Sequence, residues 1–230
     1  MSRAIAEIWT NKREPDFPVG IDDPIIKRAR FIQSTPPSPP FTPPITPKET
    51  MKSFKVAVWI SASSLVGTTT AGAGDANKLP ERAESTTNKV NYDYIAFDTA
   101  TEENAFFQYK LPIGWDEGKL TFRVLWTNTA GLTTETVVFG LKAQPLSDND
   151  TIDTAWGTEI TVTDTWQAQN KVHISPLSTD VTIGAGANGT AVEGDIVMFN
   201  IARKTGSDNL TGDARLLGIE IIYQRTTPTD

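Results

Sequence analysis

Acidic side chains dominate the reactive groups of this sequence, which has 28 Asp and Glu residues, a single histidine and no cysteine. Without cysteine, a disulfide framework, a zinc–thiolate site and a thiol nucleophile are excluded. A Ser-His-Asp triad would have to use His173, but no motif in the sequence resembles a nucleophile elbow. We therefore interpret His173 as a hydrogen-bonded residue of a strand. We expect no catalytic residues, no cofactor and a protein that is not an enzyme.

Acidic clusters could instead hold a metal ion. The run 148–153 places oxygen ligands at alternating positions, as a calcium loop does, but it lacks the glycine and the closing glutamate of such a loop. Asp208 and Asp213 form a second acidic pair. Aspartates in turns commonly hydrogen-bond their own backbone. We interpret both clusters as turns, expect no metal site, and expect Asp213, near Arg215, to fix the base of a hairpin.

Paired carboxylates could also cleave glycosidic bonds, a reaction that needs two carboxyl groups close together in space. The candidates are Glu102 with Glu103, Asp116 with Glu117, and Asp164. In a chain with this many acidic residues, they are better interpreted as parts of solvated faces.

Tryptophans could form a platform for a sugar, because an aromatic face stacks on the apolar face of a sugar ring. Trp126 alternates with apolar residues and is expected to be buried. Trp156 and Trp166 occur in polar, turn-rich surroundings, so they are our candidates for contact with a partner or a glycan. The alternative, that both pack over the ends of a sandwich, stays open.

The elements that would position these groups are strands. Leu120, Phe122, Val124 and Trp126 alternate with mostly polar residues, which is typical of a half-buried strand. The same period recurs at 53–60. From residue 92 onward eight strands are expected, with no convincing helical period. They cover 92–97, 105–111, 120–127, 136–143, 159–163, 171–174, 195–203 and 215–223.

The last two of these strands are expected to form a long antiparallel hairpin. The polar, glycine-bearing segment 204–213 joins them and is of the kind that reverses chain direction. In the final strand, Leu217, Ile219, Ile221 and Tyr223 alternate and are expected to face the core. The pattern as a whole predicts an all-β, antiparallel, jelly-roll-like sandwich.

The first 50 residues have a different character. Prolines recur from Pro15 to Pro47, so the segment can be neither helix interior nor central strand. Large apolar residues lie among the prolines, unlike the composition of an ordinary disordered spacer. We expect an extended proline-rich arm that docks in grooves of a partner, although a flexible tail remains the alternative. The expected anchors are Trp9, Phe17, Phe31 and Phe41.

These boundaries divide the chain into three parts. Residues 1–50 form the anchoring arm, residues 51–91 form a strand with a Ser/Thr/Gly-rich connection, and residues 92–230 form the jelly-roll domain. Residues 1–60 carry nine basic and six acidic side chains, so the remainder holds the negative charge. An acidic domain is a poor nucleic-acid binder. No run approaches the roughly 20 apolar residues of a membrane span, so we expect neither nucleic acid nor membrane as a partner.

Several short motifs between residues 92 and 223 resemble a known domain. They are Phe97-Asp, Ala105-Phe-Phe, Leu111-Pro, Trp115-Asp-Glu-Gly118, Phe122-Arg-Val-Leu-Trp126 and the run 207–222. This part of the chain resembles the small jelly-roll domain at the C-terminal ends of tailed-bacteriophage head fibres, decoration proteins and tail-fibre-like proteins. The resemblance implies a virion context and a homotrimer, brings no catalytic residues, and does not extend to the arm.

Residues and resemblance together predict a non-enzymatic virion structural protein, such as a head fibre or decoration protein. Its arm would dock onto capsid or tail proteins, its jelly roll would be displayed outward, and it would assemble in the host cytoplasm. The alternative is a tail-fibre or receptor-binding module that recognises a host surface glycan. For that alternative, Trp156 and Trp166 should lie exposed together in one groove.

Overall fold

The structure is a computed structural model that describes residues 51–184 and 188–228. The arm expected at residues 1–50, with its four anchors, lies outside the described residues. Secondary structure is almost entirely strand, with one short 3-10 helix, η2 (Ala62–Ser64). The strands are β1 (Met51–Ser61), β2 (Val66–Gly67), β3 (Glu81–Glu84), β4 (Asn91–Phe97), β5 (Asn104–Lys110), β6 (Thr121–Thr127), β7 (Thr136–Leu146), β8 (Ile160–Thr165), β9 (His173–Ile174), β10 (Ile196–Arg203) and β11 (Ala214–Pro228).

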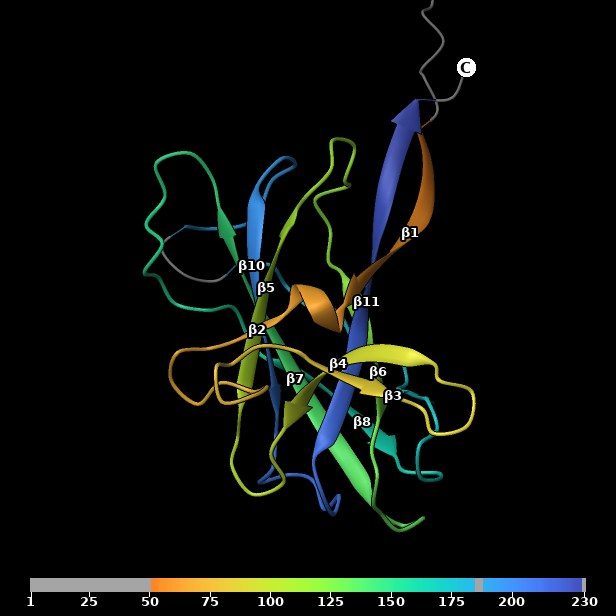
Figure 1. Cartoon of the computed structure of the whole chain (residues 1–230). Helices are drawn as coiled ribbons and strands as arrows, with labels where there is room; N and C mark the ends of the chain where they lie inside the picture. The colour runs from red at the N-terminus through yellow and green to blue at the C-terminus, as the bar shows by residue number, and fades with distance from the viewer. Residues whose placement is uncertain (1–50, 185–187, 229–230) are drawn as a thin grey trace, which may run out of the picture. The chain divides into compact units, whose positions relative to one another are not determined.

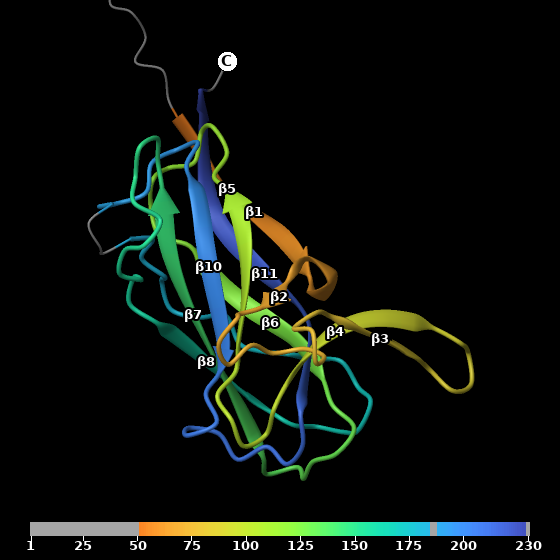
Figure 2. The same ribbon diagram turned by 60° about the vertical axis from the view of Figure 1, so that its left-hand side comes forward.

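The strands form two antiparallel sheets packed face to face (Figures 1 and 2). Sheet A has the order β3-β4-β11-β6-β9, and β1 also pairs with β11. Sheet B has the order β2-β5-β10-β7-β8. The expected fold class, an all-β jelly-roll-like sandwich, is confirmed for the described residues.

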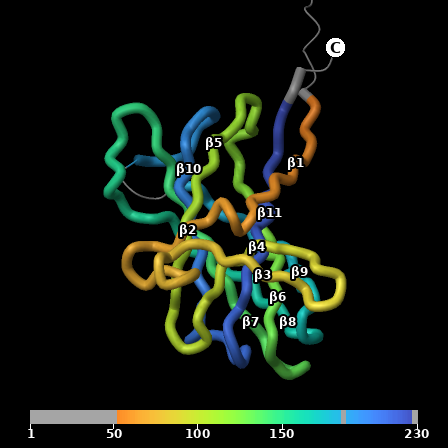
Figure 3. Tube along the Cα trace, in the orientation of Figure 1, coloured from red at the N-terminus to blue at the C-terminus, as the bar shows by residue number. Residues whose placement is uncertain are grey.

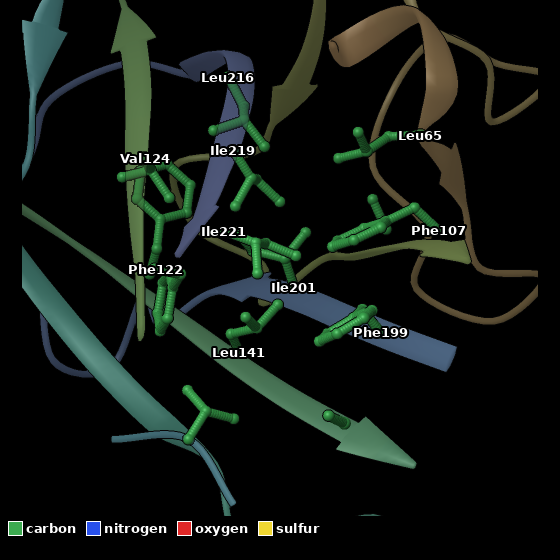
Figure 4. Close-up of a cluster of buried hydrophobic side chains, with 14 of the residues drawn as sticks. Leu65, Phe107, Phe122, Val124, Leu141, Phe199, Ile201, Leu216, Ile219 and Ile221 are labelled. Carbon is green, nitrogen blue, oxygen red and sulfur yellow. The ribbon is translucent and has the colours of Figure 1, made fainter. Parts of the chain in front are cut away.

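The core lies between the sheets and follows the alternation in the sequence. Phe122, Val124 and Trp126 of β6 have no exposed surface. Phe97 of sheet A meets Phe139 of sheet B edge to face, with ring centroids 5.7 Å apart. Figure 4 shows how side chains from both sheets interlock in this layer. Burial of these large side chains at about 1.5–3 kcal/mol each is the main source of stability.

Sequence reasoning was wrong about the C-terminal hairpin. β10 lies in sheet B between β5 and β7, whereas β11 lies in sheet A, so the two strands do not pair. The reason is Arg203 at the end of β10, whose side chain is fully buried. It donates to both carboxylate oxygens of Asp208 at 2.8 and 3.1 Å. The connection therefore wraps around a guanidinium and carries the chain from one sheet to the other.

A second correction concerns β11. Its pairing with β6 shifts register between Leu216 and Gly218, which marks a β-bulge. Leu216 is therefore fully buried, and Leu217, the residue expected in the core, points to the outer face. The expected pairing of Asp213 with Arg215 is also absent from the contacts of the described residues. Arg215 stacks instead on the ring of Tyr94, 4.7 Å from its centroid.

Residues 51–91 contribute to both sheets. β1 pairs along its whole length with the second half of β11, from Met51 opposite Pro228 to Ser61 opposite Gly218. This two-stranded ribbon extends away from the body of the sandwich (Figure 3). β2 pairs with β5 in sheet B, and β3 pairs with β4 in sheet A. Within the described residues, the strand expected at 53–60 therefore belongs to the sandwich, together with part of the connection that follows it.

Candidate functional site

An open cleft of about 460 Å³ lies on the outer face of sheet A. Its floor is formed by β11 and the end of β6, through Arg215, Leu217 and Thr127. One wall is the β3–β4 hairpin, and the other is the segment before β9. Tyr92 lines the cleft from the hairpin wall, and Asn170 and Val172 line it from the opposite wall.

Local sequence explains why the hairpin wall stands where it does. Ser85 closes the turn, because its hydroxyl and its backbone amide both bond to Val90, the hydroxyl accepting from the Val90 amide at 2.9 Å. Lys89 has a φ of 55°, the left-handed conformation that lets the chain reverse. Arg82 pairs with Asp93 across the two strands at 2.7 Å. These contacts fix Tyr92 at the cleft.

The floor depends on the β-bulge. The extra residue in β11 turns Leu217 outward, so that Arg215 and Leu217 both line the cleft. Side chains two residues apart in a strand share a face, so without the bulge Arg215 and Leu217 would both turn inward with Ile219 and Ile221.

Arg215 is positioned but has unused hydrogen-bonding capacity. Its guanidinium stacks on Tyr94, whose hydroxyl donates to Glu81 at 3.0 Å. Burial raises the pKa of Tyr94, and the hydrogen bond to Glu81 adds to that shift, so the hydroxyl remains a neutral donor. Among the described residues, no group accepts a hydrogen bond from the Arg215 side chain. Its N–H groups are therefore available to a ligand or to water.

Two further polar groups of the cleft have no hydrogen-bond partner within the described chain: the hydroxyl of Tyr92 and the side-chain amide of Asn170. The ring of Tyr92 lies 6.0 Å from that of Tyr94, so the two form an aromatic pair beside Arg215. Asn170 has a φ of 55° and its backbone amide donates to Asn128 at 2.9 Å, which holds it at the cleft rim. The cleft thus combines aromatic and aliphatic surface with free donors and acceptors.

Trp156 and Trp166 do not lie together. They flank opposite ends of β8, a strand of six residues, which separates them by roughly 20 Å. Trp156 is 36% exposed, and the amine of Lys142 lies 5.9 Å from its ring centroid. Neither indole lines the cleft. Their separation removes the shared groove that the glycan alternative required of them, and an individual contact role for each stays a prediction.

Trp166 belongs to a stack at one end of the sandwich. The ring of His173 lies between Trp126, at 4.4 Å, and Trp166, at 6.5 Å. The indole N–H of Trp166 donates to Asn128. His173 is fully buried and its Nε2 lies 3.2 Å from the carbonyl oxygen of Ala168, as expected for a strand histidine, although its Nδ1 has no partner among the described residues.

Four of the five carboxylates considered for glycoside cleavage, all except Glu117, have structural partners. Asp164 accepts a hydrogen bond from the indole of Trp126 at 2.8 Å. Glu102 pairs with Lys204 at 2.6 Å. Glu103 and Asp116 each accept from a backbone amide.

The acidic run 148–153 is a turn in which Asp150 accepts from the Ser147 amide at 2.8 Å, and Asn149 adopts a φ of 67°. Within residues 51–184 and 188–228, no group of three or more His, Asp or Glu side chains is arranged to hold a metal ion. In the same residues, no helix is long and apolar enough to cross a bilayer.

Sequence reasoning missed the cleft residues Tyr92 and Arg215. One signal was present: Gly218 interrupts the strand pattern of β11, and a glycine inside a strand commonly marks a bulge or a close approach.

No family model matches this chain, and no curated relative matches it. The solved structures similar to it include two carbohydrate-binding modules. TmCBM61, in complex with β-1,4-galactotriose, shares 12% identity at a TM-score of 0.31, with 72% of this chain and 87% of that chain covered. CBM28, a module specific for non-crystalline cellulose, shares 12% identity at a TM-score of 0.34, with 71% and 84% covered. Values this low say nothing about whether this chain shares their ligands.

Proposed function

We propose that this protein is a non-enzymatic carbohydrate-binding module and that its binding site is the cleft on the outer face of sheet A. The observation that carries this proposal is Arg215. The residue is partly buried and its guanidinium is held in place by Tyr94, yet it has no acceptor among the described residues. Guanidinium groups without acceptors are costly to desolvate, so a position of this kind favours a ligand rich in acceptor oxygens.

The chemistry of the cleft matches that of a sugar. A sugar ring presents hydroxyls that both donate and accept, together with faces of C–H groups. The cleft offers apolar surface from Tyr92, Val172 and Leu217, and polar groups from Arg215 and Asn170. A largely apolar pocket with a few convergent polar groups is the usual form of a small-ligand site.

The charge of the chain argues against nucleic acid as the polymer that is bound. The net charge is −7, and phosphate backbones require clustered Lys and Arg. A neutral or weakly charged polymer such as a polysaccharide avoids that repulsion.

The test is a screen of immobilised polysaccharides with the full chain, followed by calorimetry. Wild type should bind at least one of galactan, glucan, mannan and xylan. Arg215→Met should weaken that binding by about 10- to 100-fold, because hydrogen bonds to a charged group contribute about 1.5–3 kcal/mol. Trp156→Ala, in the segment between β7 and β8 and outside the cleft lining, is the control and should bind as wild type does. Equal binding by Arg215→Met and wild type would refute the assignment of the cleft.

A second proposal concerns residues 1–50 and is favoured by where they join the sandwich. β1 begins at Met51 opposite Pro228, at the far end of the ribbon. Arg215 lies 13 residues earlier on β11, roughly 40 Å along the strand. An anchor at one end and a binding site at the other would suit a module displayed from a larger assembly.

We propose a virion as that assembly, on the resemblance of residues 92–223 to virion jelly rolls, with Trp9, Phe17, Phe31 and Phe41 contacting capsid or tail proteins of a homotrimeric fibre. Deleting residues 1–47 should abolish incorporation into particles and leave polysaccharide binding unchanged. Normal incorporation of the shortened chain would contradict the anchor.

A further inference from the structure

An exposed tryptophan, Trp59, lies over β11 one residue beyond the cleft floor. Trp59 is on β1, opposite Glu220 of β11, and is 49% exposed. Its six-membered ring lies over Gly218, where a Cβ atom would come within 2.4 Å of Cη2 and Cζ2. The backbone of β11 thus supports one side of the indole, and glycine at position 218 leaves the room for it.

The cleft and Trp59 occupy successive positions along one strand. Arg215 and Leu217 form the cleft floor, Gly218 lies beneath the indole, and Glu220 is the cross-strand partner of Trp59. From residue 215 to residue 220, the outer face of β11 spans roughly 17 Å. That span is longer than one sugar ring and corresponds to a short oligosaccharide.

The surface beyond the indole is polar. Glu220 accepts a hydrogen bond from Arg123 of β6, and the side chain of Arg123 remains 42% exposed. An aromatic face with a carboxylate and a guanidinium nearby also occurs in the cleft, where Tyr92, Arg215 and Glu84 are lining residues, although Arg215 and Glu84 form no ion pair there. The repeat of that combination along β11 favours a ligand that itself repeats.

We propose that the site takes a linear glycan chain of several units, which runs along the outer face of β11 from the cleft across the indole of Trp59. This inference rests on the proposed function, since it assigns the length and form of the carbohydrate bound there. The cleft holds one end of the chain, and Trp59 stacks on a sugar ring farther along it. A chain too short to reach Trp59 gains nothing from the indole.

The experiment compares disaccharides with hexasaccharides of the same linkage, drawn from β-1,4-linked galactan, glucan, mannan and xylan, by calorimetry on the full chain. Wild type should bind the hexasaccharide more tightly than the disaccharide. Trp59→Ala should weaken hexasaccharide binding roughly five- to tenfold and leave disaccharide binding unchanged. Trp59→Phe keeps an aromatic face and should therefore retain most of the hexasaccharide affinity that Trp59→Ala loses. Trp156→Ala is the matched tryptophan control.

The outcomes separate this inference from the function on which it rests. If Arg215→Met loses binding while Trp59→Ala binds the hexasaccharide as wild type does, the cleft stands and the extension over Trp59 is wrong. If none of the four polysaccharides binds, or Arg215→Met binds normally, the proposed function itself fails. If Trp59→Ala converts an oligomer into monomers in light scattering without changing glycan affinity, the face is a contact between copies and the extension is overturned.

Discussion

Two arginines near the start of β11 have opposite environments. Arg203, before the β10–β11 connection, is fully buried and makes five hydrogen bonds, to Asp208 twice and to the carbonyls of Phe97, Leu210 and Gly212. Arg215, just after the connection, has its stack on Tyr94 and no acceptor among the described residues.

The two arginines differ in how many of their hydrogen-bond donors the protein itself uses, and this difference distinguishes a structural role from a binding role. All five donors of the Arg203 guanidinium are used by the protein, so that side chain has no capacity left for a ligand. Arg215 is fixed in position by an aromatic contact that uses none of its donors. An arginine that is held in place without an acceptor in the protein keeps its donors free for a ligand.

The largest predicted effect is on the buried arginine. Arg203→Met leaves the Asp208 carboxylate buried without its partner, and removing one member of a buried ion pair costs about 3–5 kcal/mol. The free energy of unfolding, measured in urea, should fall by that amount, or the chain should fail to fold. Arg203→Lys keeps the charge but loses the planar fork of donors. Its free energy of unfolding should lie between those of wild type and Arg203→Met. A loss under about 1 kcal/mol for Arg203→Met would mean that the network is not what holds the connection.

Glu135, which bonds to the same β10–β11 connection, should make the free energy of unfolding depend on pH. Its carboxylate accepts hydrogen bonds from the hydroxyl and amide of Thr211 and from the amide of Leu132. The Thr211 hydroxyl, followed by these amides, lowers the pKa of Glu135 below its ordinary value of 4.5. Because the folded pKa lies below the unfolded one, this stabilisation is complete at neutral pH and is lost as the pH falls below about 4.5.

Glu135→Gln should therefore lower the free energy of unfolding by about 1 kcal/mol at pH 7 and by less near pH 3. Urea unfolding of both proteins across this pH range is the measurement. A difference that grows towards acid pH would reverse the sign and contradict the assignment.

Arg215→Met should show the opposite behaviour to Arg203→Met, with a small effect on stability and a large effect on binding. It removes only an aromatic contact of the folded protein, so stability should change by no more than about 1 kcal/mol, while carbohydrate binding weakens by about 10- to 100-fold. Thermal unfolding and calorimetry of the same preparation test both halves. Loss of stability comparable to that of Arg203→Met would place Arg215 among the structural residues.

The smallest effect is expected at Trp156, in the segment between β7 and β8 of sheet B. Its ring is partly exposed and has a single cationic neighbour, Lys142. Trp156→Ala should change stability by at most about 1 kcal/mol, the value of an exposed cation–π contact. A clear loss of glycan binding in this variant would move the site to sheet B.

The same contrast explains how far the sequence could predict the structure. Alternation identified the core face of β6, because side-chain direction in a strand is a local property. It could not identify strand partners, since pairing β10 with β7 and not with β11 depends on contacts around Arg203. β3 was missed because Glu81 to Glu84 lacks the apolar period that marks a strand.

The cleft could not be predicted from the sequence, for a related reason. Its residues come from the β3–β4 hairpin, β6, the segment before β9 and β11, and only the fold brings them together. The bulge at Leu217 also reversed the side-chain directions that alternation assigned. Trp156 and Trp166 were chosen for their surroundings in sequence, and the fold places them at opposite ends of β8.

The central claim is tested most directly by locating the ligand. Amide chemical shifts of the isotopically labelled full chain would be recorded during titration with the hexasaccharides of galactan, glucan, mannan and xylan. The account predicts that the largest shifts occur at Tyr92, Thr127, Val172 and Arg215, and that they extend to Trp59 and Gly218. Shifts centred on Trp156, or no shifts with any of the four, would contradict it.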